Sequence, residues 1–311
     1  MADWAGDGEG ELMQMRGTWY IVPTPFDPDG ELDLVSLRRL VEAAAVWGVD
    51  GLTVMGVMAE PGALTGAERA AALRTVFEAA GHLPVAVGCS APSTTTALEL
   101  IGQARDLGAV AAMLAAPPLL RNIDQLPGFF RTAATGGLPL VIQDEPNATG
   151  VLLPVSSILA AAEASGSRTM KIEDPPTPAK IGRILAAQPD LDVFGGLGGV
   201  AALGELRRGA CGTMTGFAYP EILRGVRERV EAGRLRDAGL LFDRYLPLIQ
   251  FEAQPIVGLA IRKEVLRRRG ILASHRTRGF APNVDPVTLE ELDDLLERLA
   301  IVPSAERFEP G

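Results

Sequence analysis

Short apolar runs alternate with amphipathic stretches along most of the chain. Runs of roughly four to six nearly continuous apolar residues are typical of strands covered on both faces in a parallel sheet. The runs begin near Gly17, Gly51, Pro84, Ala111, Pro139, Thr169, Asp192 and Gly212. We therefore expect a parallel sheet with one strand at each of these positions.

Segments with helical spacing of apolar residues lie between the runs, for example at 34–44 and 96–104. Thr65 and Glu68 stand three residues apart at the start of another such segment, as in a capping box. This regular alternation predicts an α/β fold, a closed (β/α)8 TIM barrel over residues 17–221. No Gly-rich phosphate fingerprint follows the first run, so a dinucleotide-binding sheet is not favoured.

The two ends of the chain have a different character. Residues 222–311 predict helices at 227–238, 254–269 and 288–299 with a loop at 274–287, and no linker precedes them, so we expect a C-terminal helical extension packed on the barrel. Residues 1–16 are acidic and lack the apolar core of a signal peptide, which predicts a flexible leader. Because no apolar run is long enough to span a bilayer, we expect a cytoplasmic protein with no membrane partner.

The composition limits the kinds of partner and site that we expect for this chain. The 311 residues carry a formal charge of −10, which argues against a nucleic-acid partner. Two Cys and two His residues support neither a disulfide framework nor a metal site. Among the 29 basic residues, the lysines are Lys171, Lys180 and Lys263. Lys180 and Lys263 lie in helical stretches and are expected to be solvated.

Lys171 lies at the end of the sixth predicted strand, where a TIM barrel carries its chemistry. Loss of hydration there favours a neutral amine, which is a nucleophile toward carbonyl groups. The alternative is a buried lysine paired with Glu173 or Glu145 for stability alone. Strand alternation places Gln143 and Glu145 on one side and Asp144 on the other. Glu145 is therefore a candidate general acid or base, unless it only pairs with an arginine at the strand end.

Several short motifs occur in a fixed order along the chain. They are 23–26 (PTPF), 56–60 (GVMAE), 117–118 (PP), 143–151 (QDEPNATGV) and 170–173 (MKIE). In their order and spacing, from about Gly17 to Leu299, the sequence resembles the dihydrodipicolinate synthase/N-acetylneuraminate lyase family of class I aldolases. The resemblance implies a TIM barrel with C-terminal helices, a Schiff base through Lys171, no further cofactor, and a homodimer or homotetramer.

The chain also departs from the family pattern. Val57 and Met58 stand where the family has two hydroxyls that hold a 2-oxo acid, and Gln143 stands in place of a strand tyrosine. Leu119-Leu120 replace a tyrosine pair that reaches a neighbouring subunit, and Ala148 replaces a carboxylate-binding arginine. Because each lost hydrogen bond removes about 0.5–1.5 kcal/mol, we expect neither dihydrodipicolinate synthesis nor ordinary sialic acid cleavage. The apolar replacements predict a less anionic, more hydrophobic substrate than pyruvate.

The sequence thus predicts a divergent Schiff-base lyase acting on a small-molecule carbonyl substrate. Lys171 attacks the carbonyl, Glu145 moves the proton, and Gln143 orients the substrate. The predicted substrate-binding residues are Val57, Met58, Leu120, Thr149, Glu173, Gly196 and Met214. Two alternatives stay open: a non-covalent hydratase or dehydratase that uses Glu145 and Glu173, and a catalytically silent barrel that binds a ligand or an assembly partner.

Overall fold

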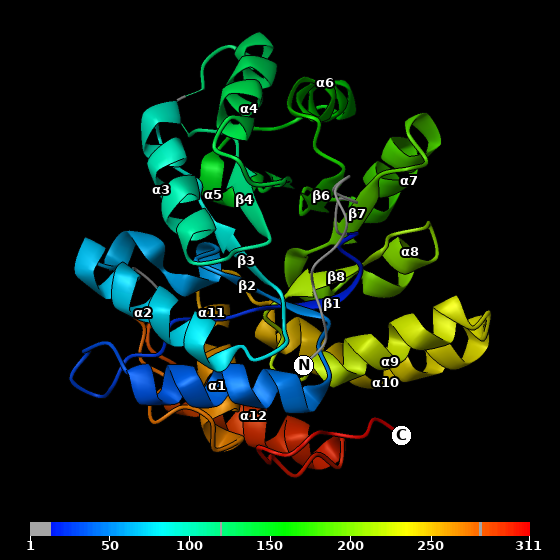
Figure 1. Ribbon diagram of the computed structural model, residues 1–311. Helices are drawn as coiled ribbons and strands as arrows, with labels where there is room; N and C mark the ends of the chain where they lie inside the picture. The colour runs from blue at the N-terminus through cyan, green and yellow to red at the C-terminus, as the bar shows by residue number, and fades with distance from the viewer. Residues whose placement is uncertain (1–13, 119, 280–281) are drawn as a thin grey trace.

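The computed structural model describes residues 14–118, 120–279 and 282–311. Eight parallel strands form a closed barrel in chain order, with β1 pairing to β8 (Figure 1), which confirms the predicted TIM barrel. The strands are β1 (Gly17–Ile21), β2 (Gly51–Val54), β3 (Val85–Gly88), β4 (Ala111–Ala115), β5 (Leu140–Asp144), β6 (Thr169–Ile172), β7 (Asp192–Gly195) and β8 (Gly212–Thr215). Each begins at the predicted residue or one residue later.

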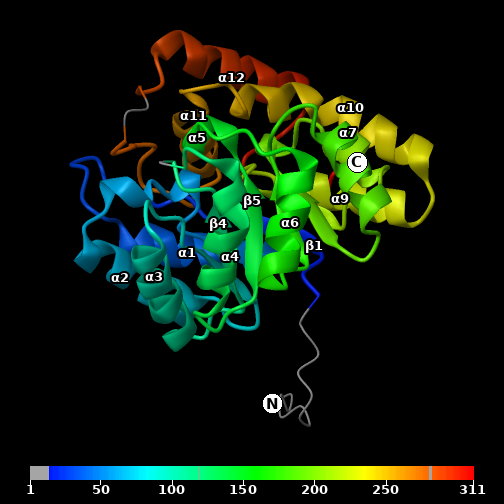
Figure 2. The same cartoon turned by 90° about the horizontal axis from the view of Figure 1, so that it is seen from above.

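Helices surround the barrel and cover the outer face of its strands (Figures 1 and 2). Those of the barrel are α1 (Leu34–Trp47), α2 (Gly66–Ala79), α3 (Thr94–Asp106), α4 (Leu126–Ala134), α5 (Pro146–Thr149), α6 (Val155–Ser165), α7 (Thr177–Ala187), α8 (Ala202–Leu206) and α9 (Pro220–Glu231). The expected capping box at the start of α2 is confirmed, because Thr65 and Glu68 each bond the other's backbone amide. The boundary predicted at residue 221 falls inside α9, and the domain division stays a prediction.

The C-terminal region consists of α10 (Leu235–Glu252), α11 (Gly258–Arg268) and α12 (Pro286–Arg298), and Figure 2 shows these helices together along one end of the barrel. The single helix predicted at 227–238 is wrong. Gly233 has a φ of 72°, in the left-handed region that ends a helix, so the chain turns between α9 and α10. The helix expected from residue 254 begins at Gly258, after Ile256 with a φ of 71°.

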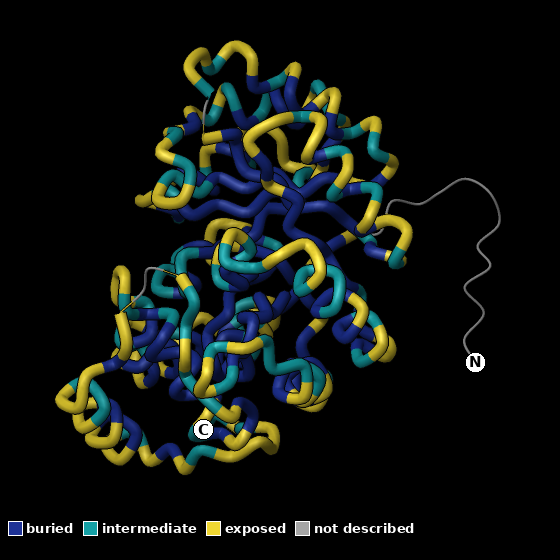
Figure 3. The backbone as a smooth tube through the Cα atoms, turned by 90° about the vertical axis from the view of Figure 1, so that its left-hand side faces the viewer, coloured by how far each residue is buried: buried dark blue, intermediate teal, exposed yellow. Residues whose placement is uncertain are grey.

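The strands are the most deeply buried part of the molecule, as the dark blue tube in Figure 3 shows, while the helices expose their outer faces. Inside the barrel, Trp19 and Phe194 meet edge to face, with ring centroids 6.4 Å apart. Met15 packs into this inner cluster and Arg16 pairs with Asp192 at 2.8 Å, so these two residues of the predicted leader contact the barrel. Residues 1–13 lie outside the described residues. Within the described chain, no helix is long and apolar enough to cross a membrane.

Candidate active site

A cavity of about 370 Å³ lies at the carboxyl ends of the strands, with part of its wall supplied by α10 and α11. Seven of the predicted site residues line it: Val57, Met58, Gln143, Glu145, Lys171, Glu173 and Met214. These residues lie in or follow β2, β5, β6 and β8, and the closed barrel brings the carboxyl ends of these strands to one rim. The fold therefore assembles most of the predicted site in one cavity.

The remaining predicted residues, Thr149, Gly196 and Leu120, do not line this cavity. Thr149 lines a second cavity of about 210 Å³, which shares Gln143 and Glu145 with the first. A Cβ atom on Gly196 would lie 2.4 Å from Cγ of Glu173, so glycine is needed there for close packing, and its contact with the substrate stays a prediction. Leu120, which is among the described residues, packs against the hydrophobic core and lines neither cavity. Leu119 lies outside the described residues.

Lys171 is 5% exposed and forms a buried ion pair. Its Nζ atom lies 2.8 Å from Oε2 of Glu173. The same oxygen accepts a hydrogen bond from Nε2 of Gln143 at 2.7 Å, and Oε1 of Glu173 accepts one from the amide of Leu197 at 3.3 Å. Three donors therefore fix this carboxylate beside the amine, which gives Lys171 a proton acceptor at contact distance.

Glu145 contributes a second carboxyl group to the cavity. Its Oε2 accepts a hydrogen bond from the amide of Ala148 at 2.5 Å and caps α5. Burial raises the pKa of Glu145; the Ala148 amide opposes this shift, and the charge of Glu173 adds to it. Among the described residues, the ion-pair partner of Lys171 is Glu173 and not Glu145. Glu145 therefore has a raised pKa and forms no ion pair with the amine of Lys171.

Strand alternation at the end of β5 is confirmed, and it places Asp144 outside the cavity. Nζ of Lys180 lies 2.6 Å from Oδ2 of Asp144 and 2.7 Å from Oδ2 of Asp174. The expectation that Lys180 is solvated is wrong: it is 4% exposed, because α7 packs against β6 and turns this residue inward. Burial raises the pKa of Asp144 to about 6, and Lys180 limits the rise.

Two charged residues of the cavity were not predicted, Glu252 at the end of α10 and Arg262 on α11. Nε of Arg262 donates to Oε2 of Glu252 at 3.1 Å. A sequence signal for Arg262 exists: it shares one helical face with Gly258, Ile261 and Val265, all of which are buried. The many basic residues in 262–269 concealed that signal. The C-terminal region therefore belongs to the site.

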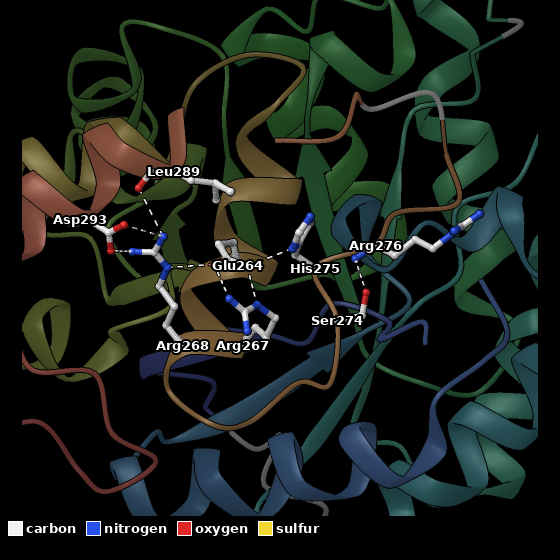
Figure 4. Close-up of polar contacts among 8 residues, drawn as sticks. All are labelled: Glu264, Arg267, Arg268, Ser274, His275, Arg276, Leu289 and Asp293. Atoms are coloured by element: carbon white, nitrogen blue, oxygen red, sulfur yellow. Dashed lines mark hydrogen bonds and ion pairs between the residues drawn. The ribbon is translucent and has the colours of Figure 1, made fainter. Parts of the chain in front are cut away.

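α11 is held in place by a cluster around Glu264 (Figure 4). The Glu264 carboxylate accepts hydrogen bonds from Arg267 at 2.7 Å and from Arg268 at 2.8 Å, and lies 2.9 Å from Nδ1 of His275. Burial would raise the pKa of Glu264, but the two arginines lower it overall. Arg268 also pairs with Asp293 of α12. These contacts fix the helix that carries Arg262.

A metal centre has no obvious ligand set, because the described residues contain no group of three or more His, Cys, Asp or Glu side chains placed to hold an ion. The side chains available for chemistry are the amine of Lys171, the guanidinium of Arg262, the carboxyls of Glu145, Glu173 and Glu252, the amides of Gln143 and Gln254, and the hydroxyl of Thr215. This set is suited to imine formation and proton transfer.

Replacing Glu205 by Gln is expected to stabilise the protein at high pH. Glu205 is 1% exposed and accepts a hydrogen bond from Thr177 at 2.5 Å, and burial raises its pKa from 4.5 to about 7. Between these values the folded state binds more protons, so the stability contribution of Glu205 falls as pH rises. We expect Glu205→Gln to increase the free energy of unfolding by about 1–2 kcal/mol at pH 8, and to change it little at pH 5.

Urea unfolding of both proteins at the two pH values measures this difference. The control is Glu163→Gln, at an exposed helical position, which is expected to change stability little at either pH. A loss of stability at pH 8, or an equal change at both pH values, would contradict the assignment of a buried ionised carboxylate.

The sequence of this chain matches a family model and is similar to enzymes of known activity. The model of the family described as the Dihydrodipicolinate synthetase family matches residues 14–299. An L-2-keto-3-deoxyarabonate dehydratase from Azospirillum brasilense is 32% identical over 294 residues, which are 91% of this chain and 94% of that protein. A 4-hydroxy-tetrahydrodipicolinate synthase from Xanthomonas axonopodis pv. citri is 32% identical over 272 residues, which are 83% of this chain and 87% of that protein.

A solved structure is similar to this chain in both fold and sequence. The crystal structure of a dihydrodipicolinate synthase from Rhodopseudomonas palustris superposes with a TM-score of 0.87 at 37% identity, over 91% of this chain and 97% of that one. The family match over residues 14–299 spans the barrel and helices α10 to α12, so it includes every element that lines the larger cavity.

Proposed function

Because this chain belongs to the dihydrodipicolinate synthetase family, we propose that it is a Schiff-base lyase that acts on a small-molecule oxo substrate through Lys171. One observation carries the proposal. Lys171 is a buried amine at the carboxyl end of β6, inside a cavity, with the carboxylate of Glu173 at 2.8 Å. Lys180 and Lys263 are also buried and paired with carboxylates, but neither lines this cavity, so the position of Lys171 in the cavity supports a chemical role.

In the proposed first half-reaction, Glu173 takes a proton from the Lys171 ammonium. The neutral amine then adds to the substrate carbonyl carbon, and the carbonyl oxygen leaves as water after two proton transfers, which gives an iminium. Gln143 holds the Glu173 carboxylate in position through its 2.7 Å hydrogen bond. In this proposal Gln143 positions the base, whereas the sequence suggested that it orients the substrate.

The second half-reaction breaks a bond next to the iminium. We favour C–O cleavage, supported by the dehydratase name of a relative that aligns over 91% of this chain. The iminium acidifies the neighbouring C–H group, a base removes that proton, and a hydroxyl group one carbon further leaves as water. Glu145 is the candidate acid for that hydroxyl, since burial raises its pKa. Water then hydrolyses the remaining imine and frees Lys171.

Borohydride trapping tests the proposal. The protein is incubated with 2-oxo acids, aldehydes and ketones, reduced, digested and analysed by mass spectrometry. We expect a reduced adduct on the peptide that contains Lys171. Lys180 and Lys263 are internal controls, since they complete the lysines of the chain and are paired with carboxylates. Failure to find any Lys171 adduct across the panel would reject the covalent mechanism.

The two carboxylates are expected to act at different steps. Glu173→Gln removes the base beside Lys171 and should slow adduct formation by about 10²–10⁴-fold. Glu145→Gln should leave adduct formation within a few-fold of wild type and slow turnover by a similar factor, because its acid acts after the imine forms. Rates of trapping and of product formation measure the two steps separately. The reverse pattern would exchange the two roles.

We also propose that the protein is a homodimer or homotetramer, on the strength of its family membership. Leu120, which replaces one of the family tyrosines that reach a neighbouring subunit, is only partly buried within a single chain and so has surface left for such a contact. Sedimentation equilibrium of the full chain measures the assembly state, and a monomer at micromolar concentration would overturn this proposal.

A further inference from the structure

Arg262 brings a buried positive charge from the C-terminal region into the active-site cavity. The residue is 5% exposed, lies on α11, and lines the cavity together with Met58 and Lys171. A guanidinium stays charged at any pH at which a protein is folded. The cavity therefore contains a permanent cation in addition to the amine of Lys171.

The contacts of this guanidinium are unequal at its two ends. Nε donates to Oε2 of Glu252 at 3.1 Å, and Nη2 faces the backbone oxygen of the same residue at 3.5 Å. At the other end, Nη1 lies 2.8 Å from Sδ of Met58. A thioether is a weak acceptor, and among the described residues Nη1 has no oxygen partner. A buried charged donor in this position lacks a strong acceptor.

Glu252 holds Arg262 but compensates its charge only in part. Its Oε2 is shared between Arg262 and the amide of Ala218 at 3.0 Å, while Oε1 has no hydrogen-bond partner within the described structure. Burial raises the pKa of Glu252 to about 7, against the opposing charge of Arg262. Near neutral pH the Glu252 carboxyl therefore neutralises the charge of Arg262 only in part, and Arg262 can bind a further anionic group.

We propose that Arg262 on α11 is a residue that binds the substrate carboxylate, so that an oxo acid is held at two points, by Lys171 and by Arg262. A carboxylate accepts two parallel N–H bonds from a guanidinium, which is the strong acceptor that Nη1 lacks. The substrate part of this inference rests on the proposed lyase function. It replaces the expectation of a less anionic substrate, which considered Val57 and Met58 but not the cation that reaches Met58 from α11.

Matched charged and neutral probes test this assignment. Borohydride trapping is measured against the concentration of 2-oxobutanoate and of its uncharged methyl ester. We expect Arg262→Gln to raise the half-saturating concentration of 2-oxobutanoate by about ten- to a hundredfold and to leave that of the ester within about twofold. Arg262→Lys keeps the charge but loses the two parallel N–H donors of the guanidinium, so it should raise the half-saturating concentration of 2-oxobutanoate by an intermediate factor. The control is Arg298→Gln, which removes an exposed arginine at the end of α12, outside the cavity.

Each other outcome has a defined meaning. Equal effects on acid and ester, or no effect on either, would overturn the role of Arg262. If wild type traps neither probe, calorimetric binding of 2-hydroxybutanoate against 2-hydroxybutanamide tests Arg262 instead, because these compounds cannot form an imine. Lack of preference for the acid there would overturn its role. The lyase proposal itself fails if the whole carbonyl panel gives no Lys171 adduct. If Arg262→Gln does not fold, the comparison is made with Arg262→Lys and with Arg262→Gln/Glu252→Gln.

Discussion

Replacing Lys171 by Arg is expected to lower turnover by at least about 10⁴-fold and to abolish borohydride trapping. Arginine keeps the positive charge 2.8 Å from Glu173, so the ion pair can persist, but a guanidinium does not form an imine with a carbonyl group. The substitution therefore separates the charge of Lys171 from its nucleophilicity. kcat and the mass of the reduced protein measure the two effects.

The control is Lys180→Arg, which makes the same exchange at a lysine whose partners Asp144 and Asp174 lie outside the cavity. It is expected to keep turnover within a few-fold of wild type. Turnover retained in Lys171→Arg would instead favour the non-covalent hydratase or dehydratase, in which Lys171 acts only through its charge. Far-UV circular dichroism of each variant establishes that a loss of turnover is not a loss of fold.

The positions of the strands and of Lys171 follow from local sequence. Each barrel strand is buried on both faces, so it must be an almost continuous apolar run, and such runs are visible without structural information. Alternation then decides which residues point inward at the strand ends, and it correctly separates Gln143 and Glu145 from Asp144. The same period of two puts Lys171 and Glu173 on one side, which explains their contact.

The burial of charged side chains does not follow from local sequence, because it depends on partners that only the fold brings close. Lys180 lies in an amphipathic helix and has a polar neighbourhood in sequence, yet it is buried against Asp144, 36 positions earlier. Arg262 pairs with Glu252 and reaches Met58, which is 204 positions away. Composition and periodicity predict the helix, but they do not predict which side chains lie opposite it in the folded protein. The barrel residues alone therefore do not account for the cation that α11 contributes to the cavity.

Lys263→Met is expected to lower the free energy of unfolding by about 3–5 kcal/mol, the usual effect of removing one partner of a buried ion pair. The expectation that Lys263 is solvated is wrong: its side chain is 0% exposed. Nζ donates to Oε1 of Glu60 at 2.6 Å and to the backbone oxygen of Arg276 at 2.9 Å, and lies 4.6 Å from the ring centre of Phe26. The variant leaves the Glu60 carboxylate buried without its cation.

Urea unfolding with an unchanged m value measures this loss. The control is Arg38→Met, which breaks a surface pair with Glu78 and should cost less than about 1 kcal/mol. Adding Glu60→Gln to Lys263→Met should restore part of the stability, because the unpaired charge is removed as well. A loss below about 1 kcal/mol in the single variant would contradict a buried pair. Glu60 lies two residues after Met58, which lines the cavity, and Lys263 follows Arg262, which lines it from α11. The pair therefore also joins the two walls of the active site.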